Sequence, residues 1–206
     1  MKRKAERKRW IIGVDEAGRG PLAGPVAVGV AVVPKDFNWG MIPGVGDSKK
    51  VSPKHREMIY RRAQDLKKQG LLDFHVALIS NVTVDRNSIS YAVSLGIERC
   101  LNKIKIDPKT ADVRLDGLLK APPEYKVQQT IIKGDAKEKI IGLASIMAKV
   151  TRDRYMVQKA KKYPKYSFEI HKGYGTKKHC EALRKYGLSF IHRKSFCKKI
   201  TAACLS

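Results

Sequence analysis

Two adjacent carboxylates, Asp15 and Glu16, stand where an apolar run ends and a glycine-rich loop begins. Hard divalent cations prefer carboxylate oxygens, and magnesium is often held by a few carboxylates together with water and substrate phosphate. Because successive strand residues point to opposite faces, the two carboxylates should project to different sides. In the loop, Gly18 and Gly20 permit a positive φ or a close backbone approach, and Arg19 can contact a phosphate. The pattern predicts a metal-binding corner beside an anion-contacting loop; an acidic hairpin turn is the alternative.

Two further acids, Asp116 and Asp135, follow predicted strands at 111–115 and 126–132. Strand ends that adjoin in one sheet would bring all the acids to one edge, where ligand sites of α/β proteins tend to lie. Clustered carboxylates raise one another's pKa, and divalent cations remove that cost. Two such ions can clamp the attacking and leaving oxygens of a phosphodiester displacement. Taken singly, Asp116 could be a turn residue and Asp135 an acid at a helix N-terminus.

The charge balance points to a polyanionic partner. The 206 residues carry 43 Lys and Arg against 19 Asp and Glu, a net charge of +24. Nucleic acid is the first candidate and an anionic membrane surface the second, but no isolated basic amphipathic helix favours the membrane. The four cysteines have no paired metal-ligand spacing, so we expect reduced thiols in a cytoplasmic protein. The longest apolar stretch, 22–33, is too short to span a bilayer.

The elements that must position the acids follow from periodicity and capping. We expect a hairpin over 10–34 and a helix from Pro53 to about Gln69 with Ser52 as N-cap. The remaining expected elements are a strand over 71–79, a helix over 84–105 capped by Thr83 or Asp85, a helix over 139–162, a loop over 165–176, a helix over 177–186 and a helical basic tail from His192. This order predicts an α/β fold with a mixed sheet and helices on both faces.

Three motifs carry a resemblance to a known family. Asp-Glu-Ala-Gly-Arg-Gly-Pro-Leu-Ala-Gly-Pro-Val at 15–26 resembles the first motif of the ribonuclease HII family. Arg-Leu-Asp-Gly at 114–117 and Lys-Gly-Asp-Ala-Lys at 133–137 look like its second and third acidic motifs, and 144–153 is similar to the helix after the last acid. The resemblance spans about 11–196. It implies a single ribonuclease H-like catalytic domain over 1–206: a mixed five-stranded sheet flanked by helices, with a basic tail at 1–9 and a C-terminal helical substrate-binding extension at about 164–206.

The resemblance also implies an activity. Members cut the RNA strand of RNA–DNA hybrids and the 5′ side of ribonucleotides embedded in duplex DNA, and they use Mg²⁺ or Mn²⁺. Carried over by position, Asp15, Glu16, Asp116 and Asp135 are the catalytic metal-binding acids, with Asp15 bridging both ions. We expect a monomer whose partners are RNA–DNA hybrid and ribonucleotide-containing DNA.

The same resemblance assigns substrate contacts. Gly18, Arg19 and Gly20 match the loop that senses the 2′-hydroxyl, the group that distinguishes RNA from DNA. Tyr174 matches a tyrosine that packs against the sugar beside the scissile phosphate, and Lys49 lies in a loop near the active site. Two positions depart from the family pattern: Leu118 stands where Asn is frequent, and Gly175 where Pro is usual.

Two interpretations remain open beside this one. A non-catalytic basic nucleic-acid-binding protein would account for the charge but not for the clustered acids. Ribonuclease HIII is disfavoured because the catalytic strand begins near residue 10 and the loop is Gly-Arg-Gly. We expect His171, His179 and His192 to be surface or phosphate contacts. The basic C-terminal residues could contact the duplex backbone or form a solvated face: Arg184, Lys185, His192, Arg193, Lys194, Lys198 and Lys199.

Overall fold

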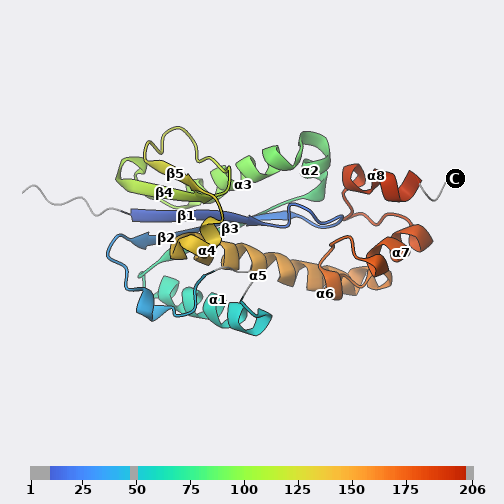
Figure 1. Cartoon of the computed structure of the whole chain (residues 1–206), viewed down its shortest axis with the longest axis horizontal. Coiled ribbons are helices and arrows are strands. Elements are labelled where there is room, and N and C mark those ends of the chain that lie inside the picture. Colours follow the sequence, from blue (N-terminus) through green and yellow to red (C-terminus); the bar gives the residue numbers. More distant parts are fainter. Residues whose placement is uncertain (1–9, 47–50, 203–206) are drawn as a thin grey trace, which may run out of the picture.

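Five strands form one mixed sheet in the order β3-β2-β1-β4-β5 (Figure 1). The computed structural model describes residues 10–46 and 51–202, so Lys49 and the predicted tail at 1–9 lie outside the described residues. The neighbours β1–β2 and β2–β3 are antiparallel, whereas β1–β4 and β4–β5 are parallel. The strands are β1 (Trp10–Ala17), β2 (Val26–Pro34), β3 (Asp73–Ile79), β4 (Ala111–Asp116) and β5 (Gln128–Ile131). The predicted mixed five-stranded sheet is confirmed, with β3 and β5 shorter than expected.

Helices cover both faces of the sheet and extend beyond one end of it (Figure 1). They are α1 (Pro53–Lys68), α2 (Asn81–Asn87), α3 (Ile89–Lys103), α4 (Gly134–Lys137), α5 (Lys139–Lys162), α6 (Phe168–His171), α7 (Lys177–Tyr186) and α8 (Lys194–Ala202). Short 3-10 turns lie at Trp39–Met41, Pro108–Thr110 and Pro164–Tyr166. Within the described residues, no helix combines the length and apolar character that a bilayer crossing requires.

The strand β2 is apolar throughout because helices pack on both of its faces. Val28 and Val30 belong to the core shared with α3, while Ala31 and Val33 belong to the core shared with α1 and α5. A strand buried on both sides shows no polar alternation. The sheet is therefore the middle layer of three. The groups that remain available for chemistry lie where the strands end.

The helix α5 lies unusually close to β1 at Gly13. A Cβ atom placed on Gly13 would lie 2.3 Å from the carbonyl oxygen of Ile140, so any side chain there would push the helix away. This close approach brings the first half of α5 against the acidic end of β1. The predicted helix over 139–162 is confirmed, including its small apolar first half.

One predicted helix is wrong. The structure has two helices, α2 and α3, in place of a single one over 84–105. Ser88 separates them with a φ of 91°, and its side chain accepts a hydrogen bond from the Tyr91 amide as the cap of α3. Ser80 caps α2, in place of Thr83 or Asp85. The carboxylate of Asp85 instead accepts hydrogen bonds from the amides of Lys194 and Ser195, at the start of α8.

The chain after α5 packs around a separate apolar cluster. Met156 of α5, Phe168, Leu183 and Ile191 are buried there together. The predicted loop over 165–176 is wrong in part, because it contains a 3-10 turn and α6; the predicted helix over 177–186 is confirmed. This C-terminal part rejoins the loop between β1 and β2, since the Gly24 amide donates to the Ile191 carbonyl at 2.8 Å.

Candidate active site

Asp15 is a buried acid near the end of β1. Its exposed fraction is 4%. The hydroxyl of Ser145 on α5 donates a hydrogen bond to its carboxylate, and the Glu16 amide donates to its Oδ1 at 2.7 Å. Burial raises the pKa of Asp15 well above the ordinary value, and the charges of Glu16 and Asp116 raise it further. The carboxylate therefore stands in surroundings that favour a cation.

Glu16 faces the other side of the sheet, as the strand alternation predicts. Together with Arg19 and Asp116 it lines a cleft of about 500 Å³ against α3. Burial and the charge of Asp116 raise the pKa of Glu16, while Arg19, whose Nη1 lies 3.4 Å from Oε1, opposes the rise. Its Oε2 is buried and has no hydrogen-bond partner among the described residues. A buried, unpaired carboxylate oxygen is costly, so this atom is a candidate metal ligand.

The parallel pairing of β1 with β4 brings Asp116 beside Asp15. Val14 pairs with Leu115, and the two acids are the next residues on their strands. Asp116 Oδ1 accepts a hydrogen bond from the Gly134 amide at 2.7 Å. Asp135 follows at the start of α4 and is 5% exposed. The structure thus gathers the four predicted acids at one sheet edge, although Asp135 begins a short helix and does not end a strand.

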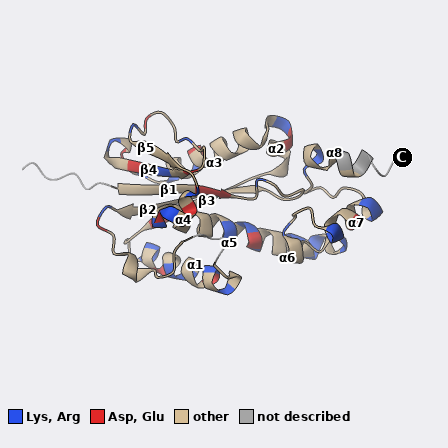
Figure 2. Cartoon of the chain, in the orientation of Figure 1, with Lys and Arg blue, Asp and Glu red and all other residues tan. Residues whose placement is uncertain are grey.

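The donor set fits hard divalent cations. The residues are all carboxylates, two of them have raised pKa values, and one oxygen lacks a partner. Across 10–46 and 51–202, no three His, Cys, Asp or Glu side chains form a ready-made ligand group. Magnesium is suited to such an open arrangement, because water and substrate phosphate supply part of its octahedral shell. Figure 2 shows the acidic stretch of β1 in the middle of a molecule whose helices carry many basic residues.

The Gly-Arg-Gly loop follows directly on β1. Gly18 is buried with a φ of 93°, whereas Arg19 and Gly20 are exposed. Two buried arginines lie beneath the connection between β1 and β2: Arg193 donates a hydrogen bond to the Gly18 carbonyl of this loop, and Arg152 donates to the Ala23 carbonyl further along the connection. The expectation that Arg193 is a duplex contact or part of a solvated face is wrong, because it is 0% exposed.

The sequence offers a signal for one of these arginines. On α5, Ser145, Lys149 and Arg152 are spaced by four and three residues, which places them on one face of an otherwise apolar stretch. Ser145 reaches Asp15, and Arg152 reaches the loop. Arg193 has no comparable signal, because it lies in a basic run and its burial depends on distant segments.

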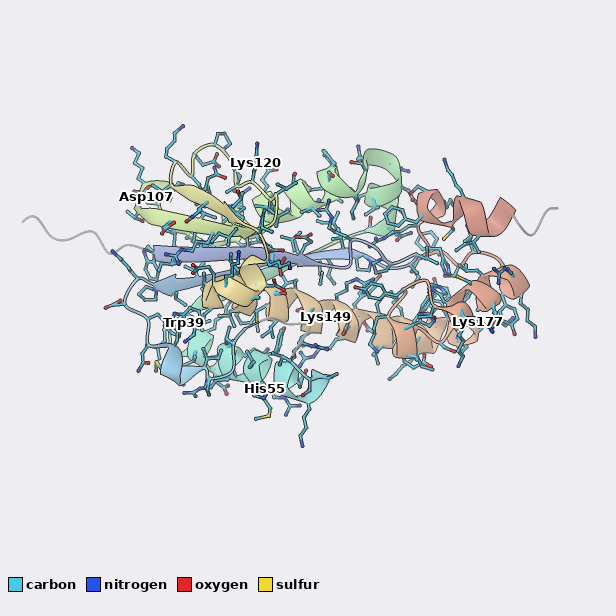
Figure 3. The ribbon with its side chains drawn as sticks, viewed as in Figure 1. Trp39, His55, Asp107, Lys120, Lys149 and Lys177 are labelled. Carbon is cyan, nitrogen blue, oxygen red and sulfur yellow. The ribbon has the colours of Figure 1, made fainter. Side chains whose placement is uncertain are left out.

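Tyr174 lies beside this polar face of α5. Its side chain is 42% exposed, and the Lys149 ammonium and the Arg152 guanidinium each lie 5.7 Å from the ring centroid. Lys149, labelled in Figure 3, also contacts Asp153 at 2.9 Å. The predicted sugar-packing ring therefore stands next to a cation that can reach a phosphate.

The three C-terminal histidines are buried, and the expectation that they lie on the surface is wrong. His179 and His192 are 0% and 1% exposed, and their Nε2 atoms are 3.0 Å apart. His171 stacks on His179 with 4.3 Å between the ring centroids. The Gly173 amide and the Tyr174 carbonyl bond to His171 and His179, respectively. The histidines therefore support the Tyr174 loop from within.

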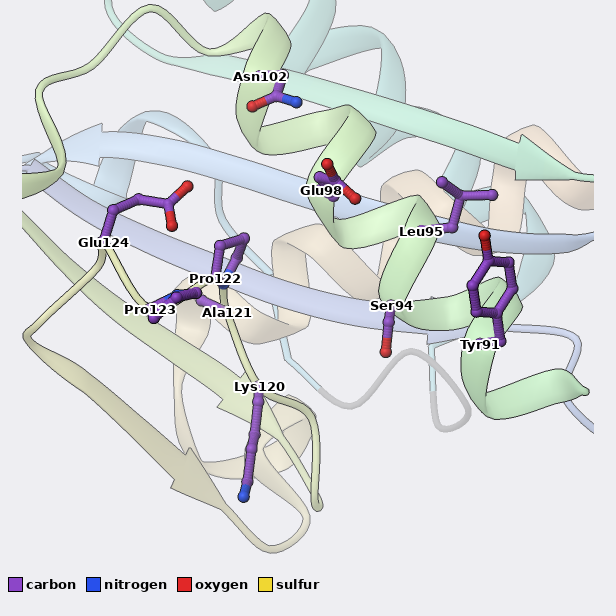
Figure 4. A pocket seen from close by; sticks show the side chains of 10 residues that line it. All are labelled: Tyr91, Ser94, Leu95, Glu98, Asn102, Lys120, Ala121, Pro122, Pro123 and Glu124. Carbon is purple, nitrogen blue, oxygen red and sulfur yellow. The ribbon is translucent and has the colours of Figure 1, made fainter. Parts of the chain in front are cut away.

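The cleft beside Glu16 continues into a second groove along α3. The two hollows share Ser94 and Lys120, and the second is also lined by Glu98, Pro122 and Glu124 (Figure 4). Leu118 lies on the cleft side and is 90% exposed. An apolar side chain at this place offers a packing surface in the cleft, where an amide would offer hydrogen bonds.

Comparison with known proteins assigns the family. The model of the family described as Ribonuclease HII matches residues 12–199. The chain belongs to the ribonuclease HII family. Ribonuclease HII of Endomicrobium trichonymphae is 46% identical over 186 residues, which cover 90% of this chain and 84% of the relative. The crystal structure of ribonuclease H2 from Pyrococcus horikoshii OT3 has a TM-score of 0.72 at 28% identity, covering 96% of this chain and 99% of that one.

A more distant structure supports the fold alone. The crystal structure of Bst-RNase HIII in complex with Mn²⁺ has a TM-score of 0.67 at 16% identity and covers 96% of this chain and 70% of that one. Membership in the ribonuclease HII family makes this chain a ribonuclease, a metal-dependent hydrolase that acts on nucleic acid.

Proposed function

We propose that this ribonuclease HII cleaves the RNA strand of RNA–DNA hybrids and the phosphodiester on the 5′ side of ribonucleotides embedded in duplex DNA. The observation that carries the proposal is the group of four acids beside the Gly-Arg-Gly loop, two of which, Asp15 and Glu16, have pKa values raised by burial. Such acids would repel phosphate in an otherwise basic chain unless cations lay between them. A chain that only bound nucleic acid would have no use for them.

The reaction is a hydrolysis at phosphorus. The oxygen of a water molecule bonds to phosphorus, the bond from phosphorus to the 3′ oxygen breaks, and that oxygen gains a proton. The products are a 3′-hydroxyl and a 5′-phosphate. Asp15, Glu16, Asp116 and Asp135 would hold Mg²⁺ or Mn²⁺, which would supply activation of the water and stabilisation of the leaving oxygen.

The other residues orient the substrate. In this proposal the amides of the Gly18–Gly20 loop contact a 2′-hydroxyl, and the ring of Tyr174 packs against the neighbouring sugar. Lys149, whose ammonium lies 5.7 Å from the centroid of that ring, would contact a phosphate. The C-terminal part at about 164–206 would extend the contact along the duplex through its basic residues, such as Lys177 and Lys185. Lys49 remains a proposed contact outside the described residues.

The deciding experiment uses a labelled DNA duplex with one embedded ribonucleotide, incubated with Mg²⁺, with Mn²⁺ and without divalent metal. We expect one metal-dependent cut on the 5′ side of the ribonucleotide. Asp15→Asn and Asp135→Asn should abolish cutting and leave duplex binding largely intact. Cutting of a continuous hybrid but not of this duplex would restrict the substrate to longer RNA. Binding without cutting under every metal would contradict the proposal.

A further inference from the structure

Arg152 and Arg193 are the two largest side chains that the fold buries completely, each 0% exposed. They approach the loop between β1 and β2 from different elements, Arg152 from α5 and Arg193 from the segment before α8. A buried guanidinium is expensive to desolvate, and an apolar side chain of similar size often serves stability as well. Their retention therefore needs a reason beyond packing.

Both guanidinium groups are satisfied by backbone carbonyls. Arg193 donates to Gly18 at 2.7 Å, to Arg19 at 2.8 Å and to Gly24 at 3.0 Å. Arg152 donates to Pro25 at 2.9 Å, to Lys172 at 3.0 Å and to Ala23 at 3.1 Å. The fixed fork of each guanidinium thus determines the direction of several peptide planes.

This arrangement decides where the loop amides point. In a trans peptide the carbonyl and the N–H point in opposite directions. Because the carbonyls of Gly18 and Arg19 are bound inward by Arg193, the N–H groups of Arg19 and Gly20 are turned outward. Both residues are exposed, and neither amide has an acceptor in the part of the chain that the structure describes. Two adjacent outward amides can donate to an oxygen atom of a ligand.

Arg152 connects this loop to Tyr174. It binds the Lys172 carbonyl, and its guanidinium lies 5.7 Å from the centroid of the Tyr174 ring. The Leu22 amide donates to the Gly173 carbonyl at 2.8 Å, which adds a direct link between the two loops. These contacts therefore fix the position of the Tyr174 loop relative to the connection between β1 and β2 that contains the Gly-Arg-Gly loop.

The two glycines of the loop differ in the space around them. A Cβ atom on Gly18 would lie 2.0 Å from Nε of Arg152, whereas one on Gly20 would meet nothing within 4 Å. The fold therefore has a steric reason for glycine at 18 and none at 20. A close approach by a ligand accounts for glycine at the second position.

We propose that Arg152 and Arg193 are positioning residues for ribonucleotide recognition: they preset the outward amides of Arg19 and Gly20 and hold the Tyr174 ring in register with them. The inference rests on the proposed function, because it concerns how the same site distinguishes a ribonucleotide from a deoxyribonucleotide. Neither arginine touches the substrate.

The test compares Arg193→Lys and Arg152→Lys with the wild type on two substrates, a duplex with one embedded ribonucleotide and a continuous RNA–DNA hybrid. Lysine keeps the charge but lacks the fork. For the embedded ribonucleotide we expect kcat/KM to fall by about tenfold relative to the hybrid, as the loss of one well-placed hydrogen bond would cause. The matched control is Arg154→Lys, because Arg154 lies on the same helix but is exposed and pairs with Glu57. It should leave the ratio unchanged.

Two results would overturn the inference: a folded arginine variant with the wild-type ratio, or one in which both substrates lose activity equally. If the lysine variants do not fold, Gly18→Ala decides, since its Cβ displaces the loop from Arg152 while both arginines remain. An unchanged ratio in Gly18→Ala would then contradict the inference. Failure of the proposed function is a separate result, in which the wild type cuts neither substrate with Mg²⁺ or Mn²⁺.

Discussion

The acidic edge of the sheet and the supported loop next to it both bury charge, but they satisfy it differently. At the edge, Asp15 and Glu16 have raised pKa values, and one oxygen of Glu16 has no hydrogen-bond partner among the described residues. Beneath the loop, the guanidinium groups of Arg152 and Arg193 each donate three hydrogen bonds to carbonyls. In the first region the charge of the acids is only partly balanced, by Arg19 beside Glu16, whereas in the second the hydrogen-bond donors of the guanidinium groups are matched by carbonyls.

The acidic region is suited to chemistry, and the supported loop is suited to positioning the substrate. Incomplete satisfaction makes a site reactive and costs stability, while complete satisfaction makes a region rigid. A loop that recognises a substrate must be rigid, and an acid group that binds cations must not be neutralised in advance. The close packing of α5 on β1 places the two regions side by side, because one face of that helix reaches both Asp15 and the loop.

The largest effect should come from Asp15→Asn. We expect cleavage to fall by roughly three orders of magnitude or more, because a proposed ligand of the catalytic cations is lost. The melting temperature at pH 7 should stay the same or rise. The raised pKa means that the ionised carboxylate destabilises the fold at neutral pH, and asparagine resembles the protonated form. Initial rates and thermal unfolding check both parts.

A marked loss of stability in Asp15→Asn would contradict the comparison, because it would mean that this acid is already well paired. Asp65→Asn is a suitable control. Asp65 is exposed on α1 and pairs with Lys68, so its replacement should leave the activity unchanged.

An intermediate effect should appear when the pH falls. Burial lowers the pKa of His179 and of His192 to about 4. In the unfolded chain both titrate near their ordinary value of about 6.5, so between about pH 6.5 and pH 4 the unfolded state binds more protons. The free energy of unfolding should therefore decrease across this window, by about 2 kcal/mol or more at pH 5, and should not depend on these groups above it.

Urea unfolding at pH 7, 6 and 5 measures this slope. His192→Gln should flatten it, whereas His55→Gln should not, because His55 is exposed on α1. An unchanged slope in His192→Gln would show that the buried histidines do not control acid stability. The histidines extend the comparison. They are buried bases that stay neutral, and they lie near buried arginines that stay charged.

The smallest effect should be stabilisation by metal alone. In the absence of nucleic acid, Mg²⁺ at about ten times its dissociation constant should raise the free energy of unfolding by about 1.4 kcal/mol, which is a few degrees in melting temperature. The shift should vanish in Asp15→Asn and persist in Arg193→Lys. Potassium chloride of matched ionic strength controls for screening. An equal shift with potassium would mean that the acids bind no specific ion.

The strands, caps and helices that depend on local sequence pattern were predicted best. The strand before Asp15, the Ser52 cap and the long α5 are confirmed, because periodicity and capping are set within a few residues. The error at Ser88 has a local cause as well: a single left-handed residue breaks the helix without disturbing the apolar spacing on either side. The four acids could be proposed from the sequence because each stands next to a predicted strand and within a motif.

The tertiary structure alone decided which charges are buried. Nothing near Arg193 in the sequence separates it from Lys194, yet one is fully buried and the other is exposed. The carbonyls of Gly18 and Arg19 that bind its guanidinium lie 175 and 174 positions earlier in the chain. The ring of His192 likewise meets His179, which lies on α7. Residue type and spacing determine which groups can do chemistry, but desolvation and hydrogen bonding between distant segments determine which of them are free to do it.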